Sequence, residues 1–177
     1  MAPRIGLTHV YYGYGKGKTT CALGLSVRAS GRGLKVVIVQ FLKDMLSGEL
    51  AQFKCLEGIR VIRGTAAPCF VKDMTPEQVA ETCGIHNRNL REAWELVQAG
   101  ECDLLVLDEV LDAYQLGVLD HDLLEEIVCR KPESLELVIT GHEPTEWIFD
   151  KADYITEMVK HRHPYDKGIK ARKGIEL

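Results

Sequence analysis

What the sequence lacks narrows its class before any motif is considered. The N-terminus has no apolar core of a secretory signal, and no apolar run is long enough to cross a bilayer. The six cysteines are too far apart for a CxxC metal or redox pair, so we interpret them as small apolar side chains, with Cys69 as the exception in a loop. The formal net charge of −4 gives no field that attracts DNA, RNA or an anionic membrane. We therefore expect a cytoplasmic protein with no nucleic-acid or membrane partner.

Short apolar segments alternate along the chain with stretches of helical period. The 177 residues suit one domain, residues 1–177, with a single core. The predicted strands are Thr8–Tyr12, Lys35–Phe41, Ile59–Arg63, Asp103–Leu107, Leu135–Thr140 and Tyr154–Met158. Three of them, at 35–41, 103–107 and 135–140, are apolar on both faces, which is typical of a parallel sheet covered by helices.

The segments between these strands supply the covering helices. Thr19–Ser30 is followed by a Gly-Arg-Gly stop, and Thr75 opens a capping box with proline at the first helical position. An apolar stripe of helical period continues to Val97, and Asp120 caps a further helix. The repeated strand–helix order predicts a doubly wound α/β fold, with a mainly parallel sheet and helices on both faces.

A glycine-rich segment joins the first predicted strand to the first predicted helix. Its residues are Gly13, Tyr14, Gly15, Lys16, Gly17, Lys18, Thr19 and Thr20. Glycines let the backbone curl so that successive N–H groups face one concavity, and the positive end of the helix adds to this anion site. We expect Lys18 to reach the phosphates of ATP and the Thr19 hydroxyl to hold Mg²⁺. Because Tyr12 stands at the first glycine of the strict GxxxxGK[ST] pattern, a glycine-rich turn that binds nothing is the alternative.

A carboxylate pair follows the apolar segment 104–107. In a parallel sheet, the carboxyl ends of the strands gather at the edge where such a loop opens. Asp108 or Glu109 is therefore a predicted ligand of Mg²⁺ (or Mn²⁺), directly or through water. The alternative is a carboxylate that only stabilises the N-terminus of the following helix.

Several motifs resemble those of the corrinoid adenosyltransferases of the cob(I)alamin type. The loop is similar to the family's GNGKGKTT, with Tyr14 in place of asparagine, and Arg28 matches an arginine on the following helix. His142 stands where the family has the arginine of ITGR. The other matching segments are 39–43 (VQFxK), 107–109 (the carboxylates), 138–141 (ITG) and the tail 163–176.

The resemblance implies a P-loop, RecA-like enzyme of cobalamin biosynthesis. Such an enzyme transfers the 5′-deoxyadenosyl group of ATP to Co(I) of cob(I)alamin or a cobinamide-like corrinoid, and releases triphosphate. It implies catalytic roles for Lys18 and Glu109, nucleotide contacts from Gly13–Thr20 and Arg28, and a corrinoid contact from Phe70 on a loop. It also implies a homodimer, and a reductant or reductase protein that supplies Co(I).

Two other classes are open on the residues alone. A small-molecule kinase or NTPase would share the loop but needs an acceptor-orienting base and an arginine-bearing lid, and residues 43–75 contain only Arg60 and Arg63 as arginines. A RecA-like module that binds nucleic acid or a partner protein needs a basic, aromatic surface, which the net charge does not favour. We interpret His161 and His163 as solvated, and the basic tail either contacts phosphate or corrinoid amides or is solvated.

Overall fold

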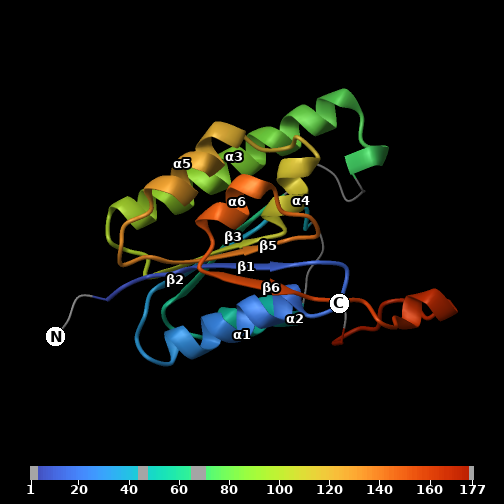
Figure 1. The fold of residues 1–177 in the computed structure, drawn as a ribbon, viewed down its shortest axis with the longest axis horizontal. Coiled ribbons are helices and arrows are strands. Elements are labelled where there is room, and N and C mark those ends of the chain that lie inside the picture. The colour runs from blue at the N-terminus through green and yellow to red at the C-terminus, as the bar shows by residue number, and fades with distance from the viewer. Residues whose placement is uncertain (1–3, 44–47, 65–70, 176–177) are drawn as a thin grey trace.

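A parallel sheet between two layers of helices forms the body of the molecule (Figure 1). The computed structural model describes residues 4–43, 48–64 and 71–175. Within them the sheet has six strands in the order β3-β2-β4-β5-β1-β6, and each neighbouring pair is parallel. The strands are β1 (Thr8–Tyr12), β2 (Val36–Gln40), β3 (Ile59–Arg63), β4 (Leu104–Asp108), β5 (Glu136–Thr140) and β6 (Tyr154–Glu157).

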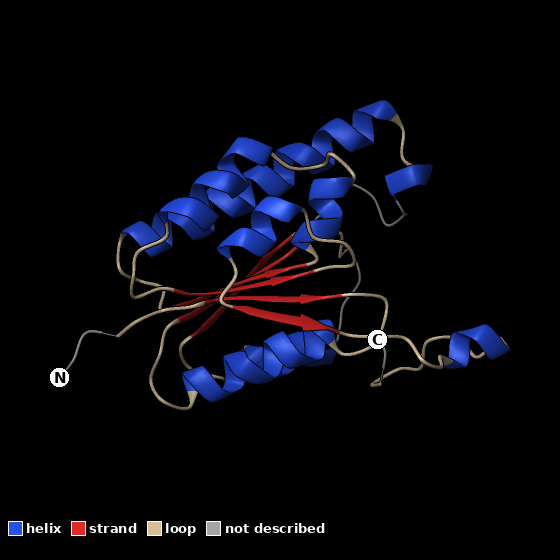
Figure 2. Cartoon of the chain, viewed as in Figure 1, coloured by secondary structure: helices blue, strands red, loops and turns tan. Residues whose placement is uncertain are grey.

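The helices divide between the two faces of the sheet (Figure 2). One face carries α1 (Lys18–Ser30) and α2 (Gly48–Phe53). The other carries α3 (Pro76–Gln98), α4 (Val110–Gln115), α5 (His121–Arg130) and α6 (Glu146–Lys151). Two 3₁₀ turns, Val71–Asp73 and Pro164–Lys167, complete the described elements. In the described part of the chain, no helix has both the length and the hydrophobicity needed to cross a membrane.

The predicted doubly wound fold is confirmed. All six predicted strands are present, and each end lies within one residue of its expected place. The Thr75 capping box forms, since Thr75 Oγ1 accepts from Gln78 N, and Asp120 accepts from Leu123 N. Sequence reasoning missed α2, α4 and α6, because six residues are too short to show a helical period.

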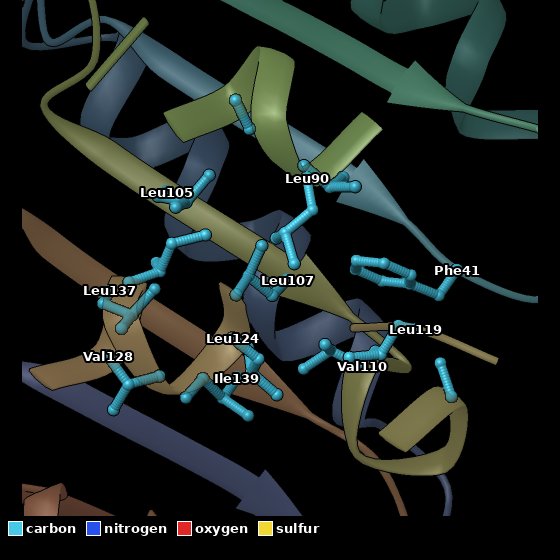
Figure 3. Packing of buried hydrophobic residues seen from close by; sticks show 14 of the residues in the cluster. Phe41, Leu90, Leu105, Leu107, Val110, Leu119, Leu124, Val128, Leu137 and Ile139 are labelled. Atoms are coloured by element: carbon cyan, nitrogen blue, oxygen red, sulfur yellow. The ribbon is translucent and has the colours of Figure 1, made fainter. Parts of the chain in front are cut away.

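Two apolar layers hold the sheet to its helices. On one face, side chains of α3 and α5 such as Leu90 and Leu124 pack over Leu105, Leu107 and Ile139 (Figure 3). On the other face, a smaller cluster joins α1 to the alternate side chains of the same strands. The central strands β2 and β4 are buried at every position, which explains their continuous apolar sequence.

The cysteines only partly fit their expected role as apolar side chains. Cys102 is buried, and burial raises its pKa to about 12, so its thiol stays protonated and unreactive. Cys21, Cys55 and Cys129 are exposed, and for these three the interpretation is wrong. Cys21 and Cys129 lie on the outer sides of α1 and α5, where the apolar period does not select the residue type, and Cys55 lies in the turn after α2. Cys69 lies outside the described residues.

The C-terminal part of the chain is the least covered. Strand β6 forms one edge of the sheet beside β1, and all four of its residues are exposed. The tail then leads away from the body and turns back toward the start of α1 (Figure 1). There Lys16 Nζ donates to Ile175 O over 3.5 Å.

Candidate active site

The loop between β1 and α1 has glycines for two different reasons. Gly17 has φ +119°, a conformation that L side chains rarely adopt, and it turns the chain into α1. A Cβ on Gly13 or Gly15 would lie 2.7 or 2.5 Å from Met158 O, so these two positions admit the chain that follows β6. Substitution at any of the three would therefore distort the loop.

Only part of the loop is available to receive an anion. Gly13 N donates to His142 O over 3.0 Å, and Gly15 N donates to Met158 O over 2.5 Å. The expected run of successive free N–H groups is thus shorter than the sequence suggested. The first α-helical bond of α1 runs from Cys21 N to Gly17 O over 2.8 Å, so the helical pattern leaves the amides of residues 18–20 for a ligand. The anion site is therefore centred on the first turn of α1, where the helix dipole is positive.

Lys18 arches back over this loop. Its Nζ donates to Gly13 O over 2.6 Å and to Gly15 O over 3.2 Å. Burial lowers the pKa of Lys18, although the carboxylates of Asp112, Glu109 and Asp108 oppose the shift. The ammonium is thus held above the loop by two carbonyls that a phosphate oxygen can replace.

Asp108 is the centre of the site. It ends β4, its exposed fraction is 0%, and its two oxygens accept from four side chains. Oδ1 accepts from Thr19 Oγ1 and Thr140 Oγ1, each over 2.9 Å. Oδ2 accepts from Gln40 Nε2 over 3.4 Å and from Lys43 Nζ over 2.5 Å. A buried carboxylate requires such partners, and here they connect α1, β5 and the end of β2.

Glu109 lies at the partly exposed border of this buried network. Its backbone has φ 63°, an uncommon conformation outside glycine, and its N–H donates to Thr140 Oγ1 over 2.9 Å. Its Oε1 lies 3.5 Å from Lys43 Nζ, and a third of the side chain is exposed. Burial raises the pKa of Glu109, Lys43 opposes this, and the nearby carboxylates Asp108 and Asp112 add to it.

Lys43, Gln40 and Thr140 belong to the site, and the sequence did not assign them to it. Burial alone would lower the pKa of Lys43, but Asp108 and Glu109 outweigh it and the net shift is upward. Gln40 is paired in register with Asp108 across β2 and β4. The VQFxK motif carried a signal for two of these residues. Their role became visible only once β2 lay beside β4.

The donor set around Lys43 suits a divalent cation of the Mg²⁺ kind. The ammonium lies 3.4 Å from Thr19 Oγ1, 2.5 Å from Asp108 Oδ2 and 3.5 Å from Glu109 Oε1, where it stands in for a cation among oxygen ligands. Gln40 Oε1 is also buried there without a hydrogen-bond partner. Among the described residues, no three His, Cys, Asp or Glu side chains gather into a metal cage. Mg²⁺ characteristically takes few protein ligands and completes its shell with phosphate and water, so the residues fit this ion.

Comparison with known proteins identifies the relatives of this chain. The family model described as "ATP:corrinoid adenosyltransferase BtuR/CobO/CobP" matches residues 4–177. The chain belongs to this family. A "Corrinoid adenosyltransferase" of Pseudomonas aeruginosa is 32% identical over 97% of this chain and 84% of the relative. The "Corrinoid adenosyltransferase CobA" of Salmonella typhimurium is 31% identical over 97% of this chain and 85% of the relative.

A solved structure of an otherwise distant protein has the same fold. It is the "KaiC-like protein PH0186" of Pyrococcus horikoshii, with a TM-score of 0.57 and 17% identity over 90% of this chain and 75% of that one. At this identity the likeness establishes the α/β fold alone. The parallel sheet with helices on both faces thus agrees with the sequence prediction.

The two positions that depart from the adenosyltransferase motif contact each other. Tyr14 replaces asparagine in the loop, and His142 replaces arginine after β5. Their ring centroids are 5.1 Å apart, and the Tyr14 hydroxyl donates to Glu143. His142 Nδ1 lies 2.7 Å from Asp112 Oδ1. The exchanges therefore form one local cluster at the rim of the loop, away from Asp108.

Of the other residues named from the sequence, Arg28 is not brought to the loop within this chain. Arg28 lies in the last turn of α1, and at 1.5 Å per residue this is about 15 Å from Lys18. Phe70 lies outside the described residues, so its predicted corrinoid contact stays a prediction. His163 caps the 3₁₀ turn of the tail, where its Nδ1 accepts from Tyr165 N over 3.2 Å. Lys16 and Thr20 are exposed on the rim of the loop.

Proposed function

We propose that the protein is an ATP:corrinoid adenosyltransferase that transfers the 5′-deoxyadenosyl group of ATP to Co(I) of a corrinoid and releases triphosphate. Family membership over residues 4–177 supports the class of reaction. The observation that carries the assignment of the site is the bond from Thr19 Oγ1 to Asp108 Oδ1, 2.9 Å. It joins the first turn of α1 to the carboxylate at the end of β4, which supports a cation position beside these two groups.

The chemistry needs no general base. The Co(I) electron pair attacks C5′ of the ribose, a cobalt–carbon bond forms, and the C5′–oxygen bond breaks with its electrons on the triphosphate. No proton is removed from the nucleophile. The protein must hold the two reactants in line and stabilise the negative charge that develops on the leaving group.

The residues at the edge of the sheet where the glycine-rich loop opens, here called the loop edge, suit the stabilisation of the leaving group. Lys18, the free amides at the start of α1 and the Lys43 ammonium converge where the triphosphate charge would develop. We assign the direct metal contact to Glu109 because it is partly exposed, whereas Asp108 is already held by four donors. Mg²⁺, or Mn²⁺, would supply positive charge to the polyphosphate. Asp108 would then orient the Thr19 hydroxyl.

Further properties belong to the same proposal. We propose a single domain over residues 1–177 that acts in the cytoplasm as a homodimer and receives Co(I) from a reductant or reductase protein. An open strand edge at β6, where all four residues are exposed, supports a partner surface. Phe70 is the proposed aromatic contact to the corrinoid. Arg28 lies far from Lys18, so a nucleotide contact from Arg28 would require a site that this chain alone does not form.

Anaerobic incubation with ATP, Mg²⁺ and chemically reduced cob(I)alamin tests the proposal. The cobalt spectrum should convert to that of an adenosylated corrinoid. No spectral change, together with ADP formed in the presence of another acceptor, would instead identify a kinase with the same loop. Retention of single-stranded DNA on a filter at low salt would favour the binding-module alternative.

A further inference from the structure

The residue before Lys43 has an unfavourable backbone conformation. Leu42 has φ 56°, and among the described residues only Leu42 and Glu109 are non-glycine residues with positive φ. A left-handed conformation crowds the Cβ of an ordinary side chain, so surrounding contacts must hold it. Leu42 is half-buried and packs against the core beside Phe41.

His86 of α3 supplies such a contact from the opposite side. Its exposed fraction is 0%, and its Nε2 lies 3.4 Å from Leu42 N. Its Nδ1 lies 2.9 Å from Val118 O. A carbonyl can only accept, so Nδ1 carries the hydrogen and Nε2 accepts from Leu42 N–H. Burial lowers the pKa of His86, which keeps the ring neutral in this tautomer.

The ring is fixed in place by more than these two bonds. Phe41 meets it edge to face, with centroids 5.2 Å apart, and Phe41 N donates to Asp108 O over 3.0 Å. The backbone from Phe41 to Lys43 is therefore held on one side by β4 and on the other by α3. His86 thus links α3 and the segment after α4 to the loop that carries Lys43.

We propose that His86 is a positioning residue that holds the left-handed turn at Leu42 and thereby places the Lys43 ammonium between Thr19, Asp108 and Glu109. With the backbone fixed, Lys43 acts as the counter-ion of the two carboxylates before the nucleotide binds. A metal ion bound with ATP would supply positive charge at the same oxygens, and the Lys43 side chain would then turn toward the phosphates while its backbone stays in place. The movement of Lys43 toward the phosphates rests on the proposed function. The placement of Lys43 by His86 does not.

The alternative is that His86 only fills the core. Two conservative variants separate the readings, because the amide of asparagine reaches the position of Nδ1 and that of glutamine the position of Nε2. His86→Asn keeps the partner of Val118 and removes the acceptor for Leu42 N–H. His86→Gln keeps an acceptor near Leu42. A role in packing alone predicts similar behaviour of the two variants, and a positioning role predicts different behaviour.

The rate at which Lys43 is acylated in the nucleotide-free protein measures directly how well its ammonium is held by the carboxylates. The reaction is followed residue by residue by mass spectrometry, with Lys35 at the other end of the sheet as the internal control. In His86→Asn the Lys43 rate should rise about fivefold, the factor that corresponds to an ion pair of about 1 kcal/mol. In His86→Gln it should stay near that of wild type. An unchanged Lys43 rate in a folded His86→Asn variant overturns the proposal.

Leu42→Pro is the second variant if His86→Asn does not fold. Proline has no N–H to donate to His86 and fixes φ at about −65°, so the left-handed turn cannot form and Lys43 should again be acylated faster. An unchanged Lys43 rate in Leu42→Pro also overturns the proposal.

A double-mutant cycle then tests whether His86 acts through Lys43. The readout is the Mg²⁺ concentration that gives half-maximal ATP binding. Lys43→Met should lower it because a competing positive charge is gone, and His86→Asn should lower it less. Adding His86→Asn to Lys43→Met should change nothing further, whereas independent effects would add and contradict the proposal.

The outcomes separate this inference from the proposed function. Absence of ATP binding by the wild-type protein would refute the proposed function and leave the acylation result intact. Normal ATP binding by wild type with identical acylation in all variants would refute only the positioning role.

Discussion

The edge of the sheet where the glycine-rich loop opens and the edge formed by strand β6 differ in how far their side chains are buried. At the loop edge, Asp108 is completely buried and accepts from four side chains. At the sheet edge formed by β6, every residue is exposed. Among the described residues, six of the eleven exposed large hydrophobic side chains lie in this C-terminal part: Tyr154, Ile155, Val159, Tyr165, Ile169 and Ile175.

The difference indicates which parts of the proposed site are already complete in a single chain. Neutralising a triphosphate requires donors fixed before the ligand arrives, because reorganising them during reaction costs rate. Those donors are already held at the loop edge. Exposed apolar side chains along an edge strand instead suit contact with another molecule, which is the homodimer surface that we propose. Four substitutions test this difference, and their expected effects decrease in the order given.

Lys18→Ala should have the largest effect at the loop edge. It removes the ammonium that faces the loop carbonyls Gly13 O and Gly15 O, and turnover should fall by about 10²–10³-fold, as for the loss of one donor to a developing anion. Steady-state kinetics measure the loss. Lys35→Ala, at the opposite end of the sheet, is the matched control and should keep wild-type turnover. Near-normal activity of Lys18→Ala would remove Lys18 from the site.

Asp108→Asn should mainly reduce stability. The substitution leaves the part-buried Lys43 ammonium without its closest carboxylate, Asp108 Oδ2 at 2.5 Å. Breaking one partner of a buried pair costs about 3 kcal/mol, which denaturant unfolding can measure. Asp122→Asn on the exposed face of α5 serves as control. If both variants unfold at the wild-type midpoint, Asp108 does not hold the loop edge together.

Glu109→Gln should raise the stability of the protein and weaken its affinity for Mg²⁺. Burial raises the pKa of Glu109, so the folded state disfavours its charge, and that cost is present above the folded-state pKa and absent below the unfolded value of about 4.3. The glutamine variant should therefore melt higher than wild type at pH 7, with the gap closing as pH falls through this range. The Mg²⁺ concentration for half-maximal turnover should rise. Equal melting temperatures at pH 7 and an unchanged Mg²⁺ titration would contradict this assignment.

Ile155→Asp should have the smallest effect on the isolated chain. Ile155 is 49% exposed on β6, so its substitution should change the free energy of unfolding by less than about 0.5 kcal/mol. If β6 is the surface between two copies, the same change should shift the protein toward monomer in analytical ultracentrifugation. Val27→Asp, at an exposed position on α1, is the control for added charge. A variant that stays dimeric would place the interface elsewhere.

Much of the fold could be predicted because its signals are local. The strands β2, β4 and β5 are apolar on both faces, and the caps at Thr75 and Asp120 mark helix starts. Lys18, Thr19, Asp108 and Glu109 could be singled out for the same reason, since the first two open the helix after the glycine-rich loop and the other two stand at the end of an apolar strand. The order of the strands could not, because β4 lies between β2 and β5 through crossovers.

The rest of the site depends on that unpredicted order. Lys43 reaches Asp108 only because β2 pairs with β4 in a register that sets Gln40 beside Asp108. The reason for Gly13 and Gly15 lies in Met158, which is far away in sequence. The left-handed turns at Leu42 and Glu109 gave no signal either, since neither residue type favours positive φ.

The central claim is that the loop edge stabilises triphosphate as a leaving group from carbon. Its most direct test is the stoichiometry of one anaerobic turnover with chemically reduced cob(I)alamin, ATP and Mg²⁺. We expect one triphosphate for each adenosylated corrinoid, with both products formed about 10²–10³-fold more slowly in Lys18→Ala. Release of ADP and phosphate in place of triphosphate would contradict it, because the bond broken would then lie between phosphates and not at C5′.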